Sequence, residues 1–207
     1  MGEFYNDQWR LPNNENKDKS SNYSMSFDGS SQYIEFQEIN LGTVQSTSLW
    51  VKRNDNSQLE CLISGINGWG LSGLAIVAHS NGKLYLQVSG NSAASGNFGN
   101  VFGTRPAGIW YHICITRNGN SATLYIDGVS INTINLSVNG DFKVNGIGAS
   151  IVNGSQYETG GKIDHVAIFD YALSSSQVTS LYGNSTNGVG NPMSLSTKPV
   201  AYYKLGE

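Results

Sequence analysis

Residues 161–182, GKIDHVAIFDYALSSSQVTSLY, constrain the fold more than any other stretch of this sequence. Apolar residues stand at both odd and even positions of residues 163–169, which predicts a strand that is covered on both faces. The pattern then changes, because Ser174 and Gln177 have the spacing of a helical capping box and Gly183 suits the exit from a short helix. The sequence therefore predicts a two-faced strand that runs directly into one short capped helix.

Asn-Gly dipeptides divide the rest of the chain into segments of strand length. The dipeptide occurs seven times, beginning at Asn67, Asn81, Asn118, Asn139, Asn145, Asn153 and Asn187. Type I′ turns need positive φ at both central residues, which Asn and Gly tolerate. Two hairpins are clearest, one joining residues 74–79 to 83–88 and one joining residues 109–117 to 123–126. This pattern predicts an all-β antiparallel sandwich with one short C-terminal helix.

Length and charge exclude several classes of protein. A chain of 207 residues suits one large all-β domain with appendages. A net charge of −3 gives no general attraction to nucleic acid or to anionic membranes. No apolar run approaches the length of a membrane span, and the first twenty residues are too polar for a secretory signal. We therefore expect no nucleic-acid partner and no membrane insertion.

The two cysteines leave two interpretations open. Cys61 and Cys114 each lie in an apolar run, which fits two buried free thiols. A bridge between adjacent strands is the alternative, and it requires a specific geometry. Neither cysteine has zinc-like spacing to His79, His112 or His165, so we expect no metal at the thiols.

Five segments, taken in chain order, resemble those of laminin G-like jelly rolls in the concanavalin A-like lectin/glucanase superfamily. They are FDGSSQYIEF at 27–36, SLWVKRN at 48–54, GLAIVAHSNGKLYLQV at 73–88, IWYHICITRNGNSATLYIDGVSI at 109–131, and the strand and helix at 161–182. The resemblance implies a jelly-roll domain over residues 22–183, with two antiparallel sheets packed face to face.

The two ends of the chain suggest how this domain is bounded. Residues 199–207 resemble the first strand of the same domain type, and their last two residues repeat the second and third residues of the chain. We predict that this segment either starts a following repeat of a tandem array or closes the sheet of its own domain. A tail with a chance strand pattern is the alternative. Residues 1–21 then join the domain, and residues 184–198 form a linker.

The sequence gives no sign of catalysis. Glucanases of the superfamily carry Glu-x-Asp-x-Glu on one strand, which places alternate carboxylates on one face as nucleophile and acid/base. This triplet does not occur here. Glu35 and Glu38 are three residues apart and would face opposite sides of a strand, and Asp127 is a turn residue. We therefore expect no enzyme, with a glycosidase as the remote alternative.

Carbohydrate recognition is the leading function that the resemblance implies. Proteins bind sugars by stacking an aromatic ring on the pyranose and by hydrogen-bonding its hydroxyls from planar polar side chains. The loops offer both kinds of side chain at Asn67, Trp69, Phe98, Asn100, Phe102 and Tyr157, with Asn97 and Gln156 beside them. Packing beneath its own loop is the other interpretation of each ring, and the flanking glycines favour it for Trp69. We expect Trp50 and Trp110 in the core, and Phe98 and Phe102 at the surface of a long loop that spans residues 89–108.

The resemblance also implies a structural calcium ion. Asp28 and Asp164 occur at two places where many related domains hold one, and calcium takes six to eight oxygen ligands. Gln32 stands where the family often has Asp, which would weaken the site. The alternative is that Asp28 only begins a turn with Gly29 and that Asp164 accepts from nearby backbone amides.

Two classes of function follow. The first is a lectin-like adhesion module at a virion or cell surface, hence extracellular, with glycans as partners. The second is a structural spacer or assembly domain of a fibre or capsid protein, whose edges pair with neighbouring copies in a homo-oligomer. A glycan array separates the two, because a spacer gives no reproducible hits.

Overall fold

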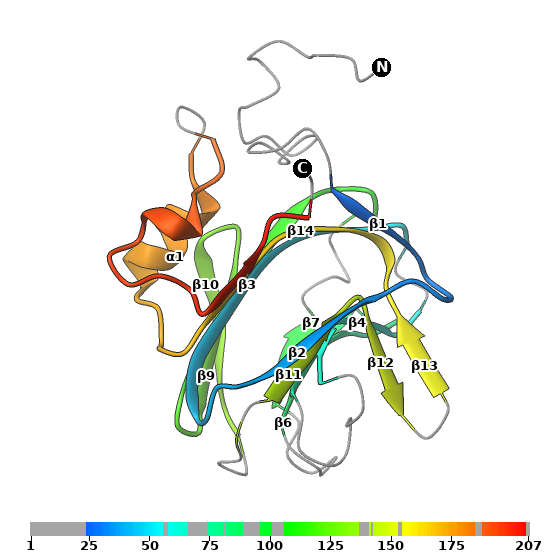
Figure 1. Cartoon of the computed structure of the whole chain (residues 1–207), viewed down its shortest axis with the longest axis horizontal. Coiled ribbons are helices and arrows are strands. Elements are labelled where there is room, and N and C mark those ends of the chain that lie inside the picture. The colour runs from blue at the N-terminus through cyan, green and yellow to red at the C-terminus, as the bar shows by residue number, and fades with distance from the viewer. Residues whose placement is uncertain are drawn as a thin grey trace.

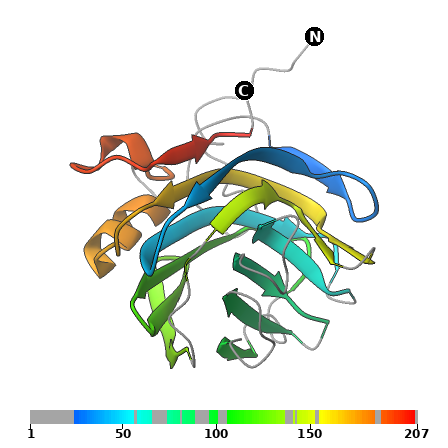
Figure 2. The same cartoon turned by 60° about the horizontal axis from the view of Figure 1, so that its bottom comes forward.

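The computed structural model describes residues 24–205, with gaps at 56–57, 66–73, 81, 89–95, 101–105, 137–140, 142, 153–154 and 185–187. Its strands form two antiparallel sheets packed face to face, which confirms the predicted sandwich (Figures 1 and 2). The seven-stranded sheet contains β1 (Met25–Asp28), β3 (Val44–Arg53), β8 (Tyr111–Asn118), β9 (Ser121–Ile126), β10 (Val129–Asn135), β14 (Gly160–Phe169) and β15 (Ala201–Tyr203). The six-stranded sheet contains β2 (Ile34–Asn40), β4 (Glu60–Ser64), β5 (Leu74–Ala78), β6 (Lys83–Val88), β7 (Gly96–Asn100) and β11 (Lys143–Ile147). A separate ribbon pairs β12 (Ala149–Val152) with β13 (Ser155–Glu158).

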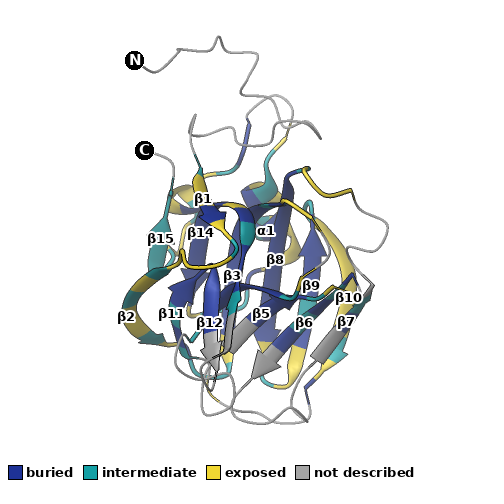
Figure 3. Cartoon of the chain, turned by 90° about the vertical axis from the view of Figure 1, so that its right-hand side faces the viewer, coloured by how far each residue is buried: buried dark blue, intermediate teal, exposed yellow. Residues whose placement is uncertain are grey.

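The main core lies between the two sheets. Leu49 and Ile113 reach into it from the seven-stranded sheet, and Leu84 and Leu86 reach into it from β6. Figure 3 shows that β3, β8 and β14 are largely buried, whereas β2 and β10 expose much of their surface. Truncating one buried leucine to alanine costs about 2–5 kcal/mol in such a core. Apolar burial between the sheets therefore stabilises the sandwich.

β14 has two covered faces, as the sequence predicts. Ile163 and Ile168 belong to the main core, whereas Phe169 packs on the other side of the sheet. The short helix α1 (Ser175–Tyr182) covers that second side through Val178 and Leu181 (Figure 1). The outer face of the seven-stranded sheet is thus closed over by α1.

The helix termini also agree with the sequence. Ser174 accepts from the backbone amide of Gln177, and the Gln177 side chain accepts from the amide of Ser174, so the capping box is present. Gly183 ends the helix with φ of 85°, which glycine adopts without strain.

Both predicted hairpins are present. Ala78 pairs with Leu84 at the β5–β6 turn, and Asn118 pairs with Ser121 at the β8–β9 turn. The expectation of a single long loop over residues 89–108 is wrong, because β7 lies within it and pairs with β6. Glycine and asparagine make up the rest of β7, so Phe98 alone gave too weak a strand pattern to detect.

Two short strands lie end to end along one edge of β14. β1 pairs with its first half, Gly160 to Ile163, and β15 pairs with its second half, Val166 to Ile168. The ring centroids of Tyr203 and Phe36 are 4.9 Å apart. Residues 201–203 therefore complete the sheet of their own chain in this structure, and a following repeat stays a prediction.

The segment between α1 and β15 packs on the domain. It contains the 3-10 turn Pro192–Ser194, and Val189 packs with Trp50 and Trp110 on the outer face of the seven-stranded sheet. The expected burial of both tryptophans is confirmed. The N-terminal segment of residues 1–21 lies outside the described residues.

Both cysteines are buried and free. Cys61 packs with Val77 on the outer side of the six-stranded sheet, and Cys114 lies beneath α1 on the opposite side of the sandwich. This placement excludes a disulfide bond between Cys61 and Cys114. In the part of the chain that the structure describes, no helix is long and apolar enough to cross a membrane.

Candidate functional site

An aromatic surface lies on the outer side of the six-stranded sheet. Its residues are Leu59, Cys61, Val77, Tyr85 and Tyr157, which we call the tyrosine face. Cys61 and Val77 form a buried floor, and the two tyrosine side chains are half-buried. An apolar floor with partly exposed rings above it is the kind of surface that takes the apolar face of a ligand.

Strand alternation places Tyr85 on this face. Leu84 and Leu86 point into the main core, so the residue between them points outward. Lys83, two residues away, lies on the same side of β6 by the same alternation. The strand thus presents a ring and an ammonium group side by side.

His79 borders the ring of Tyr85. The two ring centroids are 5.8 Å apart with an interplanar angle of 55°. His79 follows the end of β5 directly, and Ser80 Oγ lies 3.3 Å from its Nδ1 atom. The imidazole adds hydrogen-bonding capacity at the rim of the tyrosine face.

Tyr157 comes from a different part of the chain. It lies on β13, where it pairs with Ser150 of β12, and its ring joins the same cluster as Cys61 and Val77. Ser150 is buried, and its Oγ atom has no hydrogen-bond partner among the described residues. The β12–β13 ribbon therefore brings a second ring to the floor that Tyr85 covers.

The structure describes only part of the predicted glycan site. Asn67, Trp69 and Phe102 lie outside the described residues. Asn100 pairs with Lys83 through its backbone at the edge of the sheet. The expectation that Phe98 is a surface residue is wrong, because it is only 2% exposed and belongs to the main core.

Sequence reasoning missed Tyr85 and His79. The available signal was the alternation of apolar and polar positions along residues 83–88, which marks Tyr85 as the outward residue of a strand. The sequence does not show whether the outer side of that strand is covered, and here α1 covers the other sheet instead. Of the predicted ligand residues that the structure describes, Tyr157 is the one that lies on the tyrosine face.

The two predicted calcium ligands lie apart. Asp28 stands opposite Gly160, four residues along β14 from Asp164, which corresponds to about 13 Å. Asp164 is buried, and its Oδ1 atom accepts from the backbone amide of His165 at 2.8 Å and lies 2.9 Å from the Nδ1 atom of that ring. Asp28 and Asp164 therefore do not hold one ion together. Within the described part of the chain, no group of three or more His, Cys, Asp and Glu side chains is placed to hold a metal.

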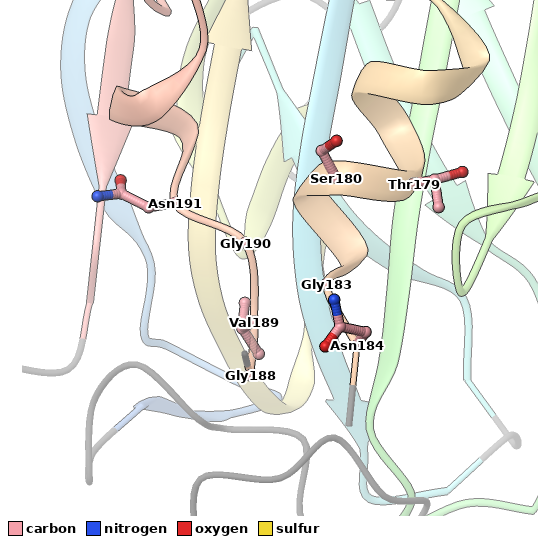
Figure 4. Close-up of a pocket in the computed structure, with 8 residues that line it drawn as sticks. All are labelled: Thr179, Ser180, Gly183, Asn184, Gly188, Val189, Gly190 and Asn191. Carbon is pink, nitrogen blue, oxygen red and sulfur yellow. The ribbon is translucent and has the colours of Figure 1, made fainter. Parts of the chain in front are cut away.

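A pocket of about 490 Å³ lies beside the C-terminal end of α1 (Figure 4). It is lined by Thr179, Ser180, Gly183, Asn184, Gly188, Val189, Gly190 and Asn191. The hydroxyls of Thr179 and Ser180 already bond to backbone carbonyls of the helix. Because this lining has neither an aromatic ring nor a charged group, it offers no surface on which a sugar ring stacks. The tyrosine face is the better candidate site.

Comparison with known proteins identifies the fold. The family model Laminin_G_3, described as the concanavalin A-like lectin/glucanases superfamily, matches residues 28–179. A heptameric pentraxin from Limulus polyphemus is similar in structure, with a TM-score of 0.59 and 17% identity over 86% of this chain and 89% of its own. No curated protein is a significant match to the sequence.

Carbohydrate-binding proteins are among the similar structures. The CBM40 module of a Ruminococcus gnavus sialidase has a TM-score of 0.57 and 14% identity, covering 79% of this chain and 98% of its own. A putative carbohydrate-binding protein from Bacteroides ovatus has a TM-score of 0.64 and 14% identity over 90% of this chain, which spans about half (52%) of that protein. At these identities the likeness establishes the jelly-roll fold alone.

Proposed function

Because this chain belongs to the concanavalin A-like lectin/glucanases superfamily, we propose that it is a non-catalytic carbohydrate-binding module whose ligand lies on the tyrosine face. The observation that carries the proposal is the pair of half-buried rings, Tyr85 and Tyr157, above the floor of Cys61 and Val77. The sialidase module and the carbohydrate-binding protein of similar structure support the same class of ligand.

The tyrosine face supplies the two components of sugar recognition. A tyrosine ring offers a flat apolar surface and a hydroxyl at its tip, and an aromatic contact contributes about 1 kcal/mol beyond area burial. Lys83 and His79 stand beside Tyr85 and supply hydrogen-bond donors for ligand hydroxyl or carboxylate groups. Stacking then fixes the plane of the sugar ring, and the polar groups fix its rotation.

The positions of the charged residues that the structure describes favour sugar binding over glycoside hydrolysis. Hydrolysis of a glycosidic bond needs two carboxyl groups on either side of it. The residues that form the tyrosine face include no carboxylate. Glu38 is on β2, where Lys143 pairs with it at 3.3 Å on the surface. We therefore propose that the module binds carbohydrate without hydrolysing it.

We place the module outside the cell or on a virion surface, where glycans are displayed. Domain 4 of AbnA, an extracellular arabinanase from Geobacillus stearothermophilus, was solved with arabinotriose and shares the fold at a TM-score of 0.52 and 21% identity. That protein supports an extracellular setting for domains of this kind.

A glycan array with the full chain tests the proposal, followed by titration of the best hit. Tyr85→Ala should weaken binding about tenfold or more, whereas Tyr85→Phe should retain most of it, because stacking needs the ring rather than the hydroxyl. Tyr33→Ala is the matched control, since Tyr33 is an exposed tyrosine outside the tyrosine face. The absence of any reproducible hit, or an unchanged affinity in folded Tyr85→Ala, would contradict the proposal.

An assembly role is the second candidate, and strand β10 favours it. This edge strand carries no charged residue, and it exposes Val129 by 63% and Ile131 by 42%. Exposed edges of this kind pair with other strands unless charges or proline prevent it. Sedimentation of the chain across a hundredfold concentration range should then show dimers, and Ile131→Lys should remove them.

A further inference from the structure

The C-terminal strand β15 packs on both faces of the seven-stranded sheet. Its residues 201–203 pair with residues 166–168 of β14, which we call the acceptor edge (Figure 1). Ala201 and Tyr203 pack against the main core. Tyr202 packs on the opposite side, against the cluster that α1 covers. One three-residue strand therefore contributes side chains to both sides of the sheet.

The acceptor edge requires a strand beside it. The side chains of Val166, Ala167 and Ile168 are completely buried. Without β15, these residues would present apolar surface and unpaired backbone groups at the edge of a sheet, where other strands pair readily. The three residues of β15 are only half-buried. The contacts of the acceptor edge are thus made with a short strand, and they do not depend on which copy of the chain supplies it.

An irregularity in β14 separates the acceptor edge from the part that pairs with β1. The register of β14 against β3 shifts between Asp164 and Ala167. His165, within this shift, has φ of 49°, a left-handed value that few residues other than glycine adopt. The pairing with β1 ends before it, at Ile163, and the pairing with β15 begins after it, at Val166. Detachment of β15 therefore leaves the pairing of β1 intact.

A two-residue connector leads from an anchored turn to β15. Lys198 Nζ donates to the carbonyls of Met193 and Leu195, and the Leu195 side chain packs against the cluster that α1 covers. Pro199 and Val200 then lead directly into the strand. Proline fixes its own φ near about −65° and forces the preceding residue out of the helical region, so the chain leaves Lys198 in an extended form. Short connectors of this kind favour exchange of the element that follows them.

We propose that β15 exchanges between two copies of this chain, so that residues 201–203 of each copy pair with the acceptor edge of the other. The product is a two-fold symmetric dimer that preserves every contact of β15 and changes only the connector. Because monomer and dimer share these contacts, the chain concentration decides between them. This dimer differs from one that forms through β10, since β15 and β10 lie at opposite ends of the seven-stranded sheet.

The exchange leaves the tyrosine face unchanged. β15 belongs to the seven-stranded sheet, whereas the tyrosine face is on the outer side of the six-stranded sheet. An exchanged dimer would therefore carry two such faces in one particle. Two linked sites raise the apparent affinity for a ligand that is displayed in many copies. The exchange goes beyond the proposed carbohydrate binding, and neither depends on the other.

Disulfide trapping in a mixture of two full-length variants tests the exchange. One variant carries Ala167→Cys and the other carries Tyr202→Cys, at positions whose Cα atoms are partners across β14 and β15. Such partners lie about 4.5–5.5 Å apart, a distance that a disulfide spans. Each monomer has only one of the two introduced cysteines, so the bond forms between chains that have exchanged β15. After incubation and mild oxidation, the fraction of cross-linked heterodimer should rise roughly tenfold or more over a hundredfold range of total concentration.

Three controls accompany the mixture. The double variant Ala167→Cys/Tyr202→Cys should form the bond within one chain at low concentration, which checks the fold and the register. Tyr202→Cys mixed with Glu38→Cys, an exposed position on β2, measures cross-linking by random collision. The wild-type chain measures any contribution from the buried Cys61 and Cys114.

Sedimentation of the Ile131→Lys chain, in which pairing through β10 is blocked, tests the exchange without a buried substitution. Its dimer fraction should rise with concentration. Adding Tyr203→Asp should abolish this dimer, because the charge would be packed against the main core of either copy. Two results would each overturn the proposal: a heterodimer signal no higher than that of the Glu38→Cys mixture while the double variant cross-links, and an Ile131→Lys chain that stays monomeric over the whole range.

Discussion

Arg53 Nε lies 2.5 Å from Glu60 Oε2, and both side chains are almost completely buried. This ion pair joins the end of β3 to the start of β4, and Glu60 also accepts from the amide of Gly160 at the start of β14. One carboxylate therefore links both sheets of the sandwich at one end.

Removing one partner of this pair should be strongly destabilising. Glu60→Ala leaves the Arg53 charge buried without its partner, which typically costs about 3–5 kcal/mol. Urea denaturation would measure the loss. Glu38→Ala breaks the exposed pair with Lys143 and should cost less than about 1 kcal/mol. Similar losses in the two variants would contradict the difference that burial predicts.

Asp28 should make stability depend on pH. The amides of Ser30 and Ser31 lower its pKa in the folded chain, so its contribution to stability is complete above the unfolded pKa of about 4. That contribution is lost as the pH falls below about 4 toward the folded pKa. The wild type should therefore exceed Asp28→Asn in unfolding free energy at pH 6, and the difference should shrink as the solution is acidified. A difference that stays constant down to pH 2 would contradict this.

Neither thiol should react in the folded protein. Burial raises the pKa of Cys61 to about 12 and raises that of Cys114 as well. Because the thiolate is the reactive form, disulfide exchange with a thiol reagent at pH 8 should be as slow as unfolding. Both thiols should react rapidly when guanidinium chloride unfolds the chain. Rapid labelling of either cysteine under native conditions would show that the residues packed over it move away in the folded protein.

Gly190 should not tolerate a side chain. An alanine Cβ at this position would lie 1.8 Å from the carbonyl oxygen of Ser180, so the segment after α1 must move away from the helix. Gly190→Ala should lower the Tm by clearly more than Gly42→Ala does and expose Trp110 and Val189, with a change in tryptophan fluorescence. Gly42→Ala is the control, because no atom lies within 4 Å of its Cβ position and its φ of 62° costs only about 1–2 kcal/mol. Equal effects of the two substitutions would contradict the steric argument.

The strand and helix at residues 160–182 were predictable because their signals are local. Alternating apolar positions, the capping pair of Ser174 and Gln177, and the turn glycines act over a few residues. The outward orientation of Tyr85 was available from the same alternation, but its exposure depends on which sheet α1 covers.

The remaining errors concern contacts made across the fold. Phe98 was misjudged because a single apolar residue among glycines and asparagines carries no periodicity. The electrostatic effect of Asp28 on Glu158 was not predicted, because Asp28 is on the first strand of the described chain. Only the pairing of β1 with β14 brings the two together, and no local pattern encodes that pairing.

Tyr157 and Glu158 are consecutive residues of β13, so their side chains leave the strand in opposite directions. Tyr157 contributes a ring to the tyrosine face, whereas Glu158 is buried on the opposite side of the strand. Any event that immobilises the carboxylate also restricts the backbone that carries the ring. The affinity of the tyrosine face for a saccharide should therefore respond to substitutions at Glu158, whose side chain lies on the other side of the same strand.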